Sequence, residues 1–129
     1  MKKIPPMTSA YVFANSGDKL QYDLLGLRFS SFGEIGSSFD GILAFVRGRS
    51  AIIDGKEQNL LNFVDAATQT RAYTMAAWQF LGALGAITLK EQQDLYNKLE
   101  KGQLFHVSFD IVEGPNGSRA RENIKVEAL

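Results

Sequence analysis

The chain has 129 residues, of which 45% are hydrophobic and 22% charged, a composition typical of a globular protein and not of a disordered one. Fourteen basic and fourteen acidic residues cancel, so the overall charge predicts neither a nucleic-acid-binding protein nor an acidic mimic of nucleic acid. The sequence contains no cysteine, which excludes disulfides, thiolate nucleophiles and cysteine-based zinc sites and is consistent with a reducing compartment.

The first residues, MKKIPPMTSAYVFA, place two lysines before an apolar stretch, as a secretory signal does. Two prolines and the pair Thr8-Ser9 interrupt this stretch before it reaches the roughly seven apolar residues that a signal needs. No segment approaches the ~20 apolar residues of a membrane span. We therefore expect one domain over residues 1–129, located in the cytoplasm and without a membrane partner.

The first third of the chain predicts short strands separated by turns. Residues 10–14 form a short apolar run, and residues 20–29 alternate with a change of phase that indicates a β-bulge. The segment Ser30–Gly41 follows and contains the triplet Ser-Ser-Phe twice. Its phenylalanines, Phe32 and Phe39, either close the ends of the sheet or lie in a glycine-rich loop where they could stack on bases.

Two further strands are predicted at residues 42–46 and 50–53. Arg47-Gly48-Arg49 between them is typical of a tight hairpin that carries two arginines at its tip.

Asn59–Ile87 is the longest apolar segment, and its periodicity predicts one long amphipathic helix. Trp78 lies at the centre of the apolar stripe and is expected in the core. Arg71 falls within the same stripe, where a buried guanidinium needs a partner. That partner is either a sheet carboxylate such as Asp23 or Asp54, in a structural ion pair, or an anion bound in a cleft between helix and sheet.

A second helix is predicted at residues 89–101, because Thr88 and Glu91 have the spacing of a capping box. The connection to the preceding helix is short, so the two helices should form an antiparallel hairpin. The long helix is also apolar on its opposite face, which neither the sheet nor this second helix can fully cover. We therefore expect a homodimer or higher oligomer through that face, formed by Tyr73, Ala77, Phe80 and Leu84.

Leu104–Glu113 alternates strictly between apolar and polar residues and predicts a strand, with a return strand at 123–127. His106, Ser108 and Asp110 share its polar face. Their Cα atoms are ~6.5–7 Å apart in a strand, too far for the ~3 Å contacts of a catalytic triad, so we interpret them as a solvated face. No metal-ligand spacing, phosphate loop or nucleophile motif is present, so we expect no metal and no cofactor, and an enzyme has the least support.

Within residues 102–129, the strand Val107–Gly114 is followed by Pro115-x-Gly117 and then by Ala120 and Asn123. This order resembles the last two strands of the bacterial cold-shock domain, with one additional residue between the last two positions. The base-stacking motifs of that family, Lys-Gly-Phe-Gly-Phe-Ile and Val-Phe-Val-His-Phe, are absent from this sequence. The resemblance implies a hairpin of an OB-type barrel and favours nucleic acid as a ligand.

The sequence thus predicts an α+β fold, in which N-terminal strands and a C-terminal β-hairpin form an antiparallel sheet packed against a helical hairpin at about 59–87 and 89–101. We expect a small non-catalytic module that binds single-stranded nucleic acid or a nucleic-acid-handling partner; the alternative is a homo-oligomeric interaction protein that binds no nucleic acid. If predicted loops converge, they form a basic groove with stacking partners, which would consist of Arg47, Arg49, Arg119, Arg121, Phe32 and Phe39.

Overall fold

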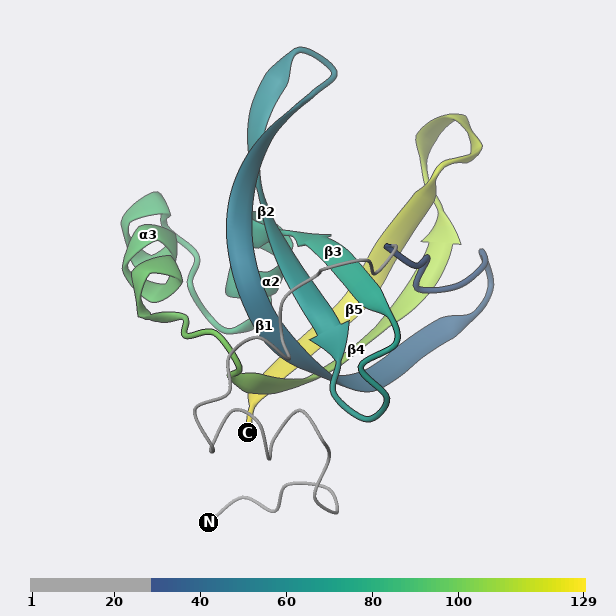
Figure 1. Cartoon of the computed structure of the whole chain (residues 1–129). Helices are drawn as coiled ribbons and strands as arrows, with labels where there is room; N and C mark the ends of the chain where they lie inside the picture. Colours follow the sequence, from purple (N-terminus) through teal and green to yellow (C-terminus); the bar gives the residue numbers. More distant parts are fainter. Residues whose placement is uncertain (1–28) are drawn as a thin grey trace.

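The computed structural model describes residues 29–129, so the strand predicted at residues 10–14 and nearly all of that at 20–29 lie outside the described residues. The described part contains a five-stranded antiparallel sheet and two helices, which confirms the predicted α+β class (Figure 1). In chain order the elements are β1 (Ser38–Ile53), β2 (Lys56–Asp65), β3 (Ala72–Ala76), α2 (Ala77–Ala83), α3 (Leu89–Lys98), β4 (Leu104–Glu113), the short 3-10 turn η2 (Pro115–Gly117) and β5 (Arg119–Ala128).

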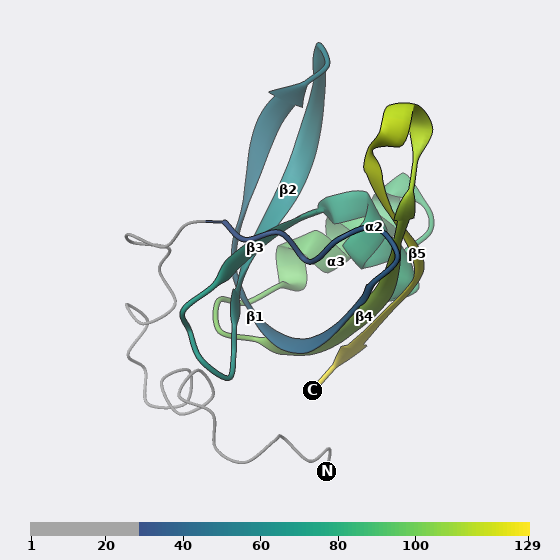
Figure 2. The same ribbon diagram turned by 90° about the vertical axis from the view of Figure 1, so that its right-hand side faces the viewer.

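The sheet has the strand order β3-β2-β1-β4-β5, so the long strand β1 lies at its centre. The first half of β1 pairs with β4 and the second half pairs with β2. The sheet curls until its two edge strands approach each other, and Figure 2 shows it as a partly closed barrel. The guanidinium of Arg121 on β5 donates a hydrogen bond across the remaining gap to the carbonyl of Thr74 on β3, 3.5 Å away.

Residues 29–37 cross the opening between the two edges of the barrel (Figure 2). At one end the amide of Ser30 donates to the carbonyl of Ala72 on β3 at 2.7 Å, and at the other the amide of Ile111 on β4 donates to the carbonyl of Ser37 at 2.9 Å. This segment therefore closes one end of the barrel, which we call the mouth.

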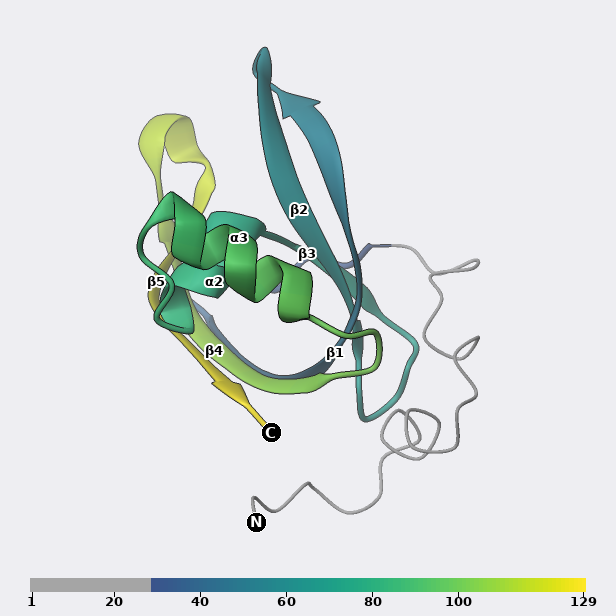
Figure 3. The same ribbon diagram turned by 90° about the vertical axis from the view of Figure 1, so that its left-hand side faces the viewer.

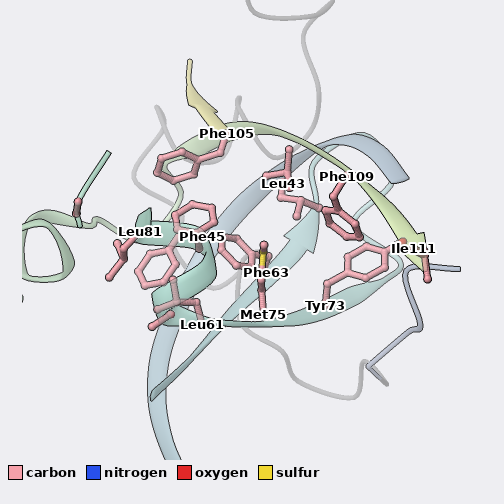
Figure 4. Packing of buried hydrophobic residues seen from close by; sticks show 14 residues of the cluster. Leu43, Phe45, Leu61, Phe63, Tyr73, Met75, Leu81, Phe105, Phe109 and Ile111 are labelled. Atoms are coloured by element: carbon pink, nitrogen blue, oxygen red, sulfur yellow. The ribbon is translucent and has the colours of Figure 1, made fainter. Parts of the chain in front are cut away.

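The core fills the barrel with side chains from the strands and from α2 (Figure 4). Phe80 of α2 is fully buried, and its ring centroid lies 4.9 Å from that of Phe63 on β2 and 4.9 Å from that of Phe105 on β4. The helix is therefore held by the strands on both sides of β1. The buried cluster consists of Leu43, Phe45, Leu61, Phe63, Tyr73, Met75, Ala77, Phe80, Leu81, Ala86, Phe105, Val107, Phe109 and Ile111.

Two hairpins project from the same end of the barrel, β1–β2 and β4–β5 (Figures 1 and 2). The first turns at Asp54-Gly55, where both residues have positive φ angles of 52° and 77°. Asp-Gly with this backbone is the preferred two-residue connection for antiparallel strands, because its twist matches theirs.

The long helix predicted at 59–87 is wrong over residues 59–76, which form most of β2, a turn and β3. Residues 60–64, LLNFV, are buried on both faces of the sheet, so they lack the alternation of a half-exposed strand. The turn between the strands is local: the carboxylate of Asp65 accepts from the amide and the hydroxyl of Thr68 at 3.0 and 2.6 Å. Helix begins only at Ala77.

The tight hairpin predicted at Arg47-Gly48-Arg49 is also wrong, because β1 runs without interruption from Ser38 to Ile53. A register shift between Phe45 and Arg47 marks a β-bulge at this point. The bulge, and not a turn, accounts for the break in the apolar pattern.

The second helix is confirmed as α3 and ends at Lys98, three residues before the predicted end. The hydroxyl of Thr88 accepts from the amide of Glu91 at 3.1 Å, and the Glu91 carboxylate accepts from the amide of Thr88 at 2.9 Å, which is the predicted capping box. Figure 3 shows α3 on the outside of the molecule, beside α2. The C-terminal hairpin is present as β4 and β5.

The predicted oligomer interface is wrong, because its residues belong to this chain's own core. Tyr73, Ala77 and Phe80 are 4%, 6% and 0% exposed, and Leu84 packs against the buried cluster. The prediction failed because it placed Tyr73 on a helix; on β3 this side chain faces the barrel interior.

Candidate functional site

A cavity of about 220 Å³ opens at the mouth of the barrel, where residues 29–33 pass β3 and β5; we call it the mouth cavity. Its lining combines aromatic rings, hydroxyl groups and two guanidinium groups. The residues concerned are Phe29, Ser30, Ser31, Phe32, Gly33, Thr74, Phe109, Ile111, Arg119, Ala120 and Arg121.

Arg121 is the central polar residue of the mouth cavity. Its position on β5 is opposite Ile111 of β4, which directs its side chain toward the barrel interior. Nη1 donates to the side-chain carbonyl of Gln79 on α2 at 2.9 Å. The guanidinium carbon lies 5.0 Å from the ring centroid of Phe32 and 5.4 Å from that of Phe109. These partners fix the guanidinium in place, and each of them is electrically neutral.

Burial lowers the pKa of the Arg121 guanidinium below its ordinary value. The group nonetheless stays protonated at neutral pH, because an arginine does not lose its proton in proteins. A partly desolvated cation with neutral partners produces a positive potential that water screens only incompletely. The mouth cavity is therefore electrostatically suited to an anion.

Arg119 lies at the outer rim of the mouth cavity and donates to the Glu34 carboxylate at 2.9 Å. Both side chains of this pair are exposed, so the pair is weak and an incoming anion can compete for Arg119. Phe29 lies on the same rim with 48% of its surface exposed. The rim thus offers one aromatic face and one arginine that is held only loosely.

Phe32 and Phe39, the predicted stacking residues, are half-buried and pack against the core. The Phe32 ring stacks on Tyr73 with centroids 4.6 Å apart, and its centroid is 4.7 Å from that of Phe39. This arrangement agrees with the interpretation that the two phenylalanines close the barrel. Phe29 is the aromatic residue of this segment that offers a free face.

The structure divides the four arginines of the predicted groove into two pairs. Arg119 and Arg121 share the mouth cavity with Phe32, whereas Arg47 and Arg49 do not line it. The register of β1 with β2 places Arg47 opposite Asn62 and Arg49 opposite Leu60, on the sheet face that points away from the core. Both side chains are exposed.

Lys56 shares this outward face with Arg47 and Arg49, since it pairs with Ile53 in the same register. Among the described residues of the β1–β2 pairing, the outward positions carry these three cations and no carboxylate, and the residues opposite Arg47 and Arg49, Asn62 and Leu60, are themselves buried. We call this the basic face of the β1–β2 hairpin. The net charge of the chain is zero, but this face of the hairpin carries a local excess of positive charge.

Arg71 is exposed and lies immediately before β3, where its backbone carbonyl accepts from the amide of Asp65 at 2.9 Å. The expectation that its guanidinium lies within an apolar helix stripe is wrong, because this part of the chain is a turn and a strand. A buried ion pair or a cleft between helix and sheet is therefore not needed to explain it.

On β4, His106 and Asp110 have partners on the neighbouring strands, and no triad is formed with Ser108. His106 Nε2 lies 2.6 Å from Asp40 Oδ1 on β1. Asp110 accepts from Asn123 at 2.8 Å and from Ser38 at 2.7 Å, and these two hydrogen bonds lower the pKa of its carboxyl group. These hydrogen bonds link β1, β4 and β5 on the outer face of the sheet.

Trp78 is 61% exposed, so the prediction that it is a core residue is wrong. It lies near the start of α2, one turn before the buried Leu81. A second cavity, of about 250 Å³, lies between it, β2 and α3, and we call it the Trp78 groove. The sequence signal was misleading because Trp78 and the fully buried Phe80 are both apolar and only two residues apart.

Among residues 29–129, no group of three or more histidine or acidic side chains is placed to hold a metal ion. Neither of the helices that the structure describes is long and apolar enough to cross a membrane. Comparison with protein-family models, with curated proteins and with solved structures finds no match to this chain.

Proposed function

We propose that this protein is a non-catalytic module that binds single-stranded nucleic acid. The observation that carries the proposal is the mouth cavity, in which the partly buried cation Arg121 has neutral partners beside the exposed ring of Phe29. Proteins that bind single strands combine positive charge for the phosphates with aromatic faces for the bases. In this proposal Arg121 and Arg119 hold a phosphate group, and the adjacent base stacks on Phe29.

The fold supports the proposal. Five antiparallel strands form a partly closed barrel with β1 between β2 and β4, and the helices α2 and α3 lie between β3 and β4 in the chain. This arrangement resembles that of an OB-type barrel, in which the loops between the first two and the last two strands take part in oligonucleotide binding. In this chain the corresponding hairpins, β1–β2 and β4–β5, project from one end (Figure 2).

The basic face of the β1–β2 hairpin supplies a path for the rest of the strand. Arg47, Arg49 and Lys56 lie on it with no outward carboxylate between them. The chain is neutral overall, so affinity rests on these local charges and should fall steeply as salt is added.

The test is fluorescence anisotropy of labelled single-stranded and duplex oligonucleotides between about 50 and 200 mM salt. We expect binding to single strands that weakens with salt, and Arg47→Gln should lower the salt slope by about one unit. Lys98→Gln, an exposed lysine on α3, is the matched control and should leave the slope unchanged. An absence of binding at the lowest salt would contradict the proposal.

A homo-oligomeric interaction protein remains the second candidate, although not through the interface predicted from the sequence. Ile87 and Leu89, between α2 and the start of α3, are 82% and 74% exposed. Exposed apolar residues in one place mark interaction surfaces. Light scattering at high micromolar concentration tests this candidate: a dimer that Leu89→Glu converts to a monomer supports it, and a monomeric wild type excludes it.

A further inference from the structure

We propose that the Trp78 groove is a pocket for one unpaired base that carries an exocyclic amino group: cytosine, adenine or guanine. This inference rests on the proposed binding of single strands and adds a base-reading site to it. It involves none of the residues of the mouth cavity.

The groove is formed by β2 on one side and by the two helices on the other, and its volume is about 250 Å³. Pockets for drug-sized ligands begin at roughly 300 Å³, so this one suits a smaller group. It is lined by Glu57, Gln58, Asn59, Ala77, Trp78, Leu81, Leu89, Gln92, Gln93 and Tyr96.

Trp78 provides a stacking surface in this groove. The residue is 61% exposed, while Leu81 and Phe80 of the same helix are 2% and 0% exposed and hold the helix against the core. Stacking on an aromatic side chain contributes substantially to the binding of an unpaired base, and every base has a face that can stack. A base in a duplex has no such free face.

The polar groups of the groove fit a neutral partner that both donates and accepts hydrogen bonds. Four carboxamide side chains line it, on Gln58, Asn59, Gln92 and Gln93. Asn59 accepts from Ser50 at 3.1 Å and Gln92 donates to the carbonyl of Ala86 at 3.1 Å, so the orientation of both amides is constrained. Carboxamides pair with base edges because they carry a donor and an acceptor side by side.

Glu57 is the only charged residue in the lining of this groove, and its charge decides between ligands. A carboxylate repels phosphate, so the phosphates of a bound strand must stay outside the groove. It also accepts hydrogen bonds only. The exocyclic amino groups of cytosine, adenine and guanine offer it N–H donors outside the ring, whereas thymine and uracil offer only the ring N3–H, which lies between two carbonyl oxygens that a carboxylate repels.

The emission of Trp78, the single tryptophan of the chain, reports occupancy of the groove directly. We expect oligo-dC to quench it and to bind about five- to tenfold more tightly than oligo-dT of the same length. Glu57→Gln should reduce this preference below about twofold, since an amide can also donate to a carbonyl oxygen. N-acetyltryptophanamide serves as the control for absorbance by the oligonucleotides.

Anisotropy of the labelled strands, measured in parallel, separates this inference from the proposed function. Oligonucleotides that bind without quenching Trp78 would contradict the proposed base pocket but not the proposed binding of single strands. Oligonucleotides that neither bind nor quench would contradict both the base pocket and the proposed function. Equal quenching by dC and dT, or quenching by a leucine-rich peptide and not by oligonucleotides, overturns the assignment of the groove to an amino-bearing base.

Discussion

The ring of Tyr96 on α3 lies against the backbone of Gly48 on β1, so closely that a Cβ atom at residue 48 would lie 2.7 Å from two of its ring carbons. Real Cβ atoms do not approach neighbours to this distance. The missing side chain of Gly48 therefore lets α3 dock on the central strand of the sheet. The connection matters for the Trp78 groove, because Tyr96 is one of the residues that line it.

We expect Gly48→Ala to destabilise the protein by about 1–3 kcal/mol, the usual cost of forcing extra atoms into a well-packed contact. Gly82→Ala is the matched control: its added Cβ meets nothing within 4 Å, and alanine in a helix should raise stability by up to about 1 kcal/mol. Urea unfolding of both variants checks the pair. Equal effects at the two positions would show that the docking of Tyr96 does not constrain residue 48.

Trp78 and Phe80 should respond to alanine substitution in opposite ways. Phe80→Ala removes a fully buried ring from the core and should cost about 3–5 kcal/mol. Trp78→Ala removes an indole that is 61% exposed and should cost less than about 1 kcal/mol. Denaturant unfolding measures both, and native Trp78 emission should lie near the wavelength of indole in water. A large loss of stability for Trp78→Ala would mean that the indole is packed.

The parts of the fold that could be predicted are those whose signals are local. The capping box of Thr88 and Glu91 and the strict alternation of β4 each lie within about ten residues, and both indicate the correct element. The segment 59–76 could not be assigned in this way, because a strand buried on both faces is apolar without alternation.

Other features depend on residues far apart in the sequence. In the sequence Gly48 resembles a turn residue. Glycine is required there because a side chain would collide with the ring of Tyr96, forty-eight residues later. The same distinction holds for the candidate sites. Arg119, Arg121 and Phe32 could be expected near one end of the sheet, whereas the exposure of Trp78 depends on which side of a seven-residue helix meets the barrel.

Stability should depend on pH through the capping box. Hydrogen bonds from the amide and the hydroxyl of Thr88, and from the amide of Ile87, lower the pKa of Glu91 below its ordinary value. A lowered pKa in the folded state means that the stabilisation is complete above the unfolded pKa and is lost as the pH falls through the folded one. Thr88→Ala should cost about 1 kcal/mol at neutral pH. The Thr88 hydroxyl also caps the amide of Glu91 at every pH, so the stability deficit of the variant, measured by urea unfolding, should shrink in acid without vanishing. A deficit that is the same at all pH values would contradict the linkage.

Arg121 provides the sharpest distinction between a binding role and a structural role. It donates to Gln79 and Thr74 and covers two aromatic rings, so it also joins β5 to α2 and β3. The stabilisation from these contacts is offset by the free-energy cost of desolvating a cation that has no carboxylate among its partners. We therefore expect Arg121→Met, which keeps most of the volume, to change stability by less than about 1 kcal/mol.

The same Arg121→Met substitution should weaken binding of single strands about tenfold or more, as the loss of a desolvated charge–phosphate contact of ~1.5–3 kcal/mol implies. Arg121→Lys keeps the charge but loses the planar fork, and it should recover only part of the affinity. Urea unfolding and anisotropy on the same preparations give both quantities. Loss of stability with unchanged affinity would mean that Arg121 has only a structural role, in joining the two edge strands. Loss of affinity with stability retained is the result that the neutral partners of its guanidinium predict.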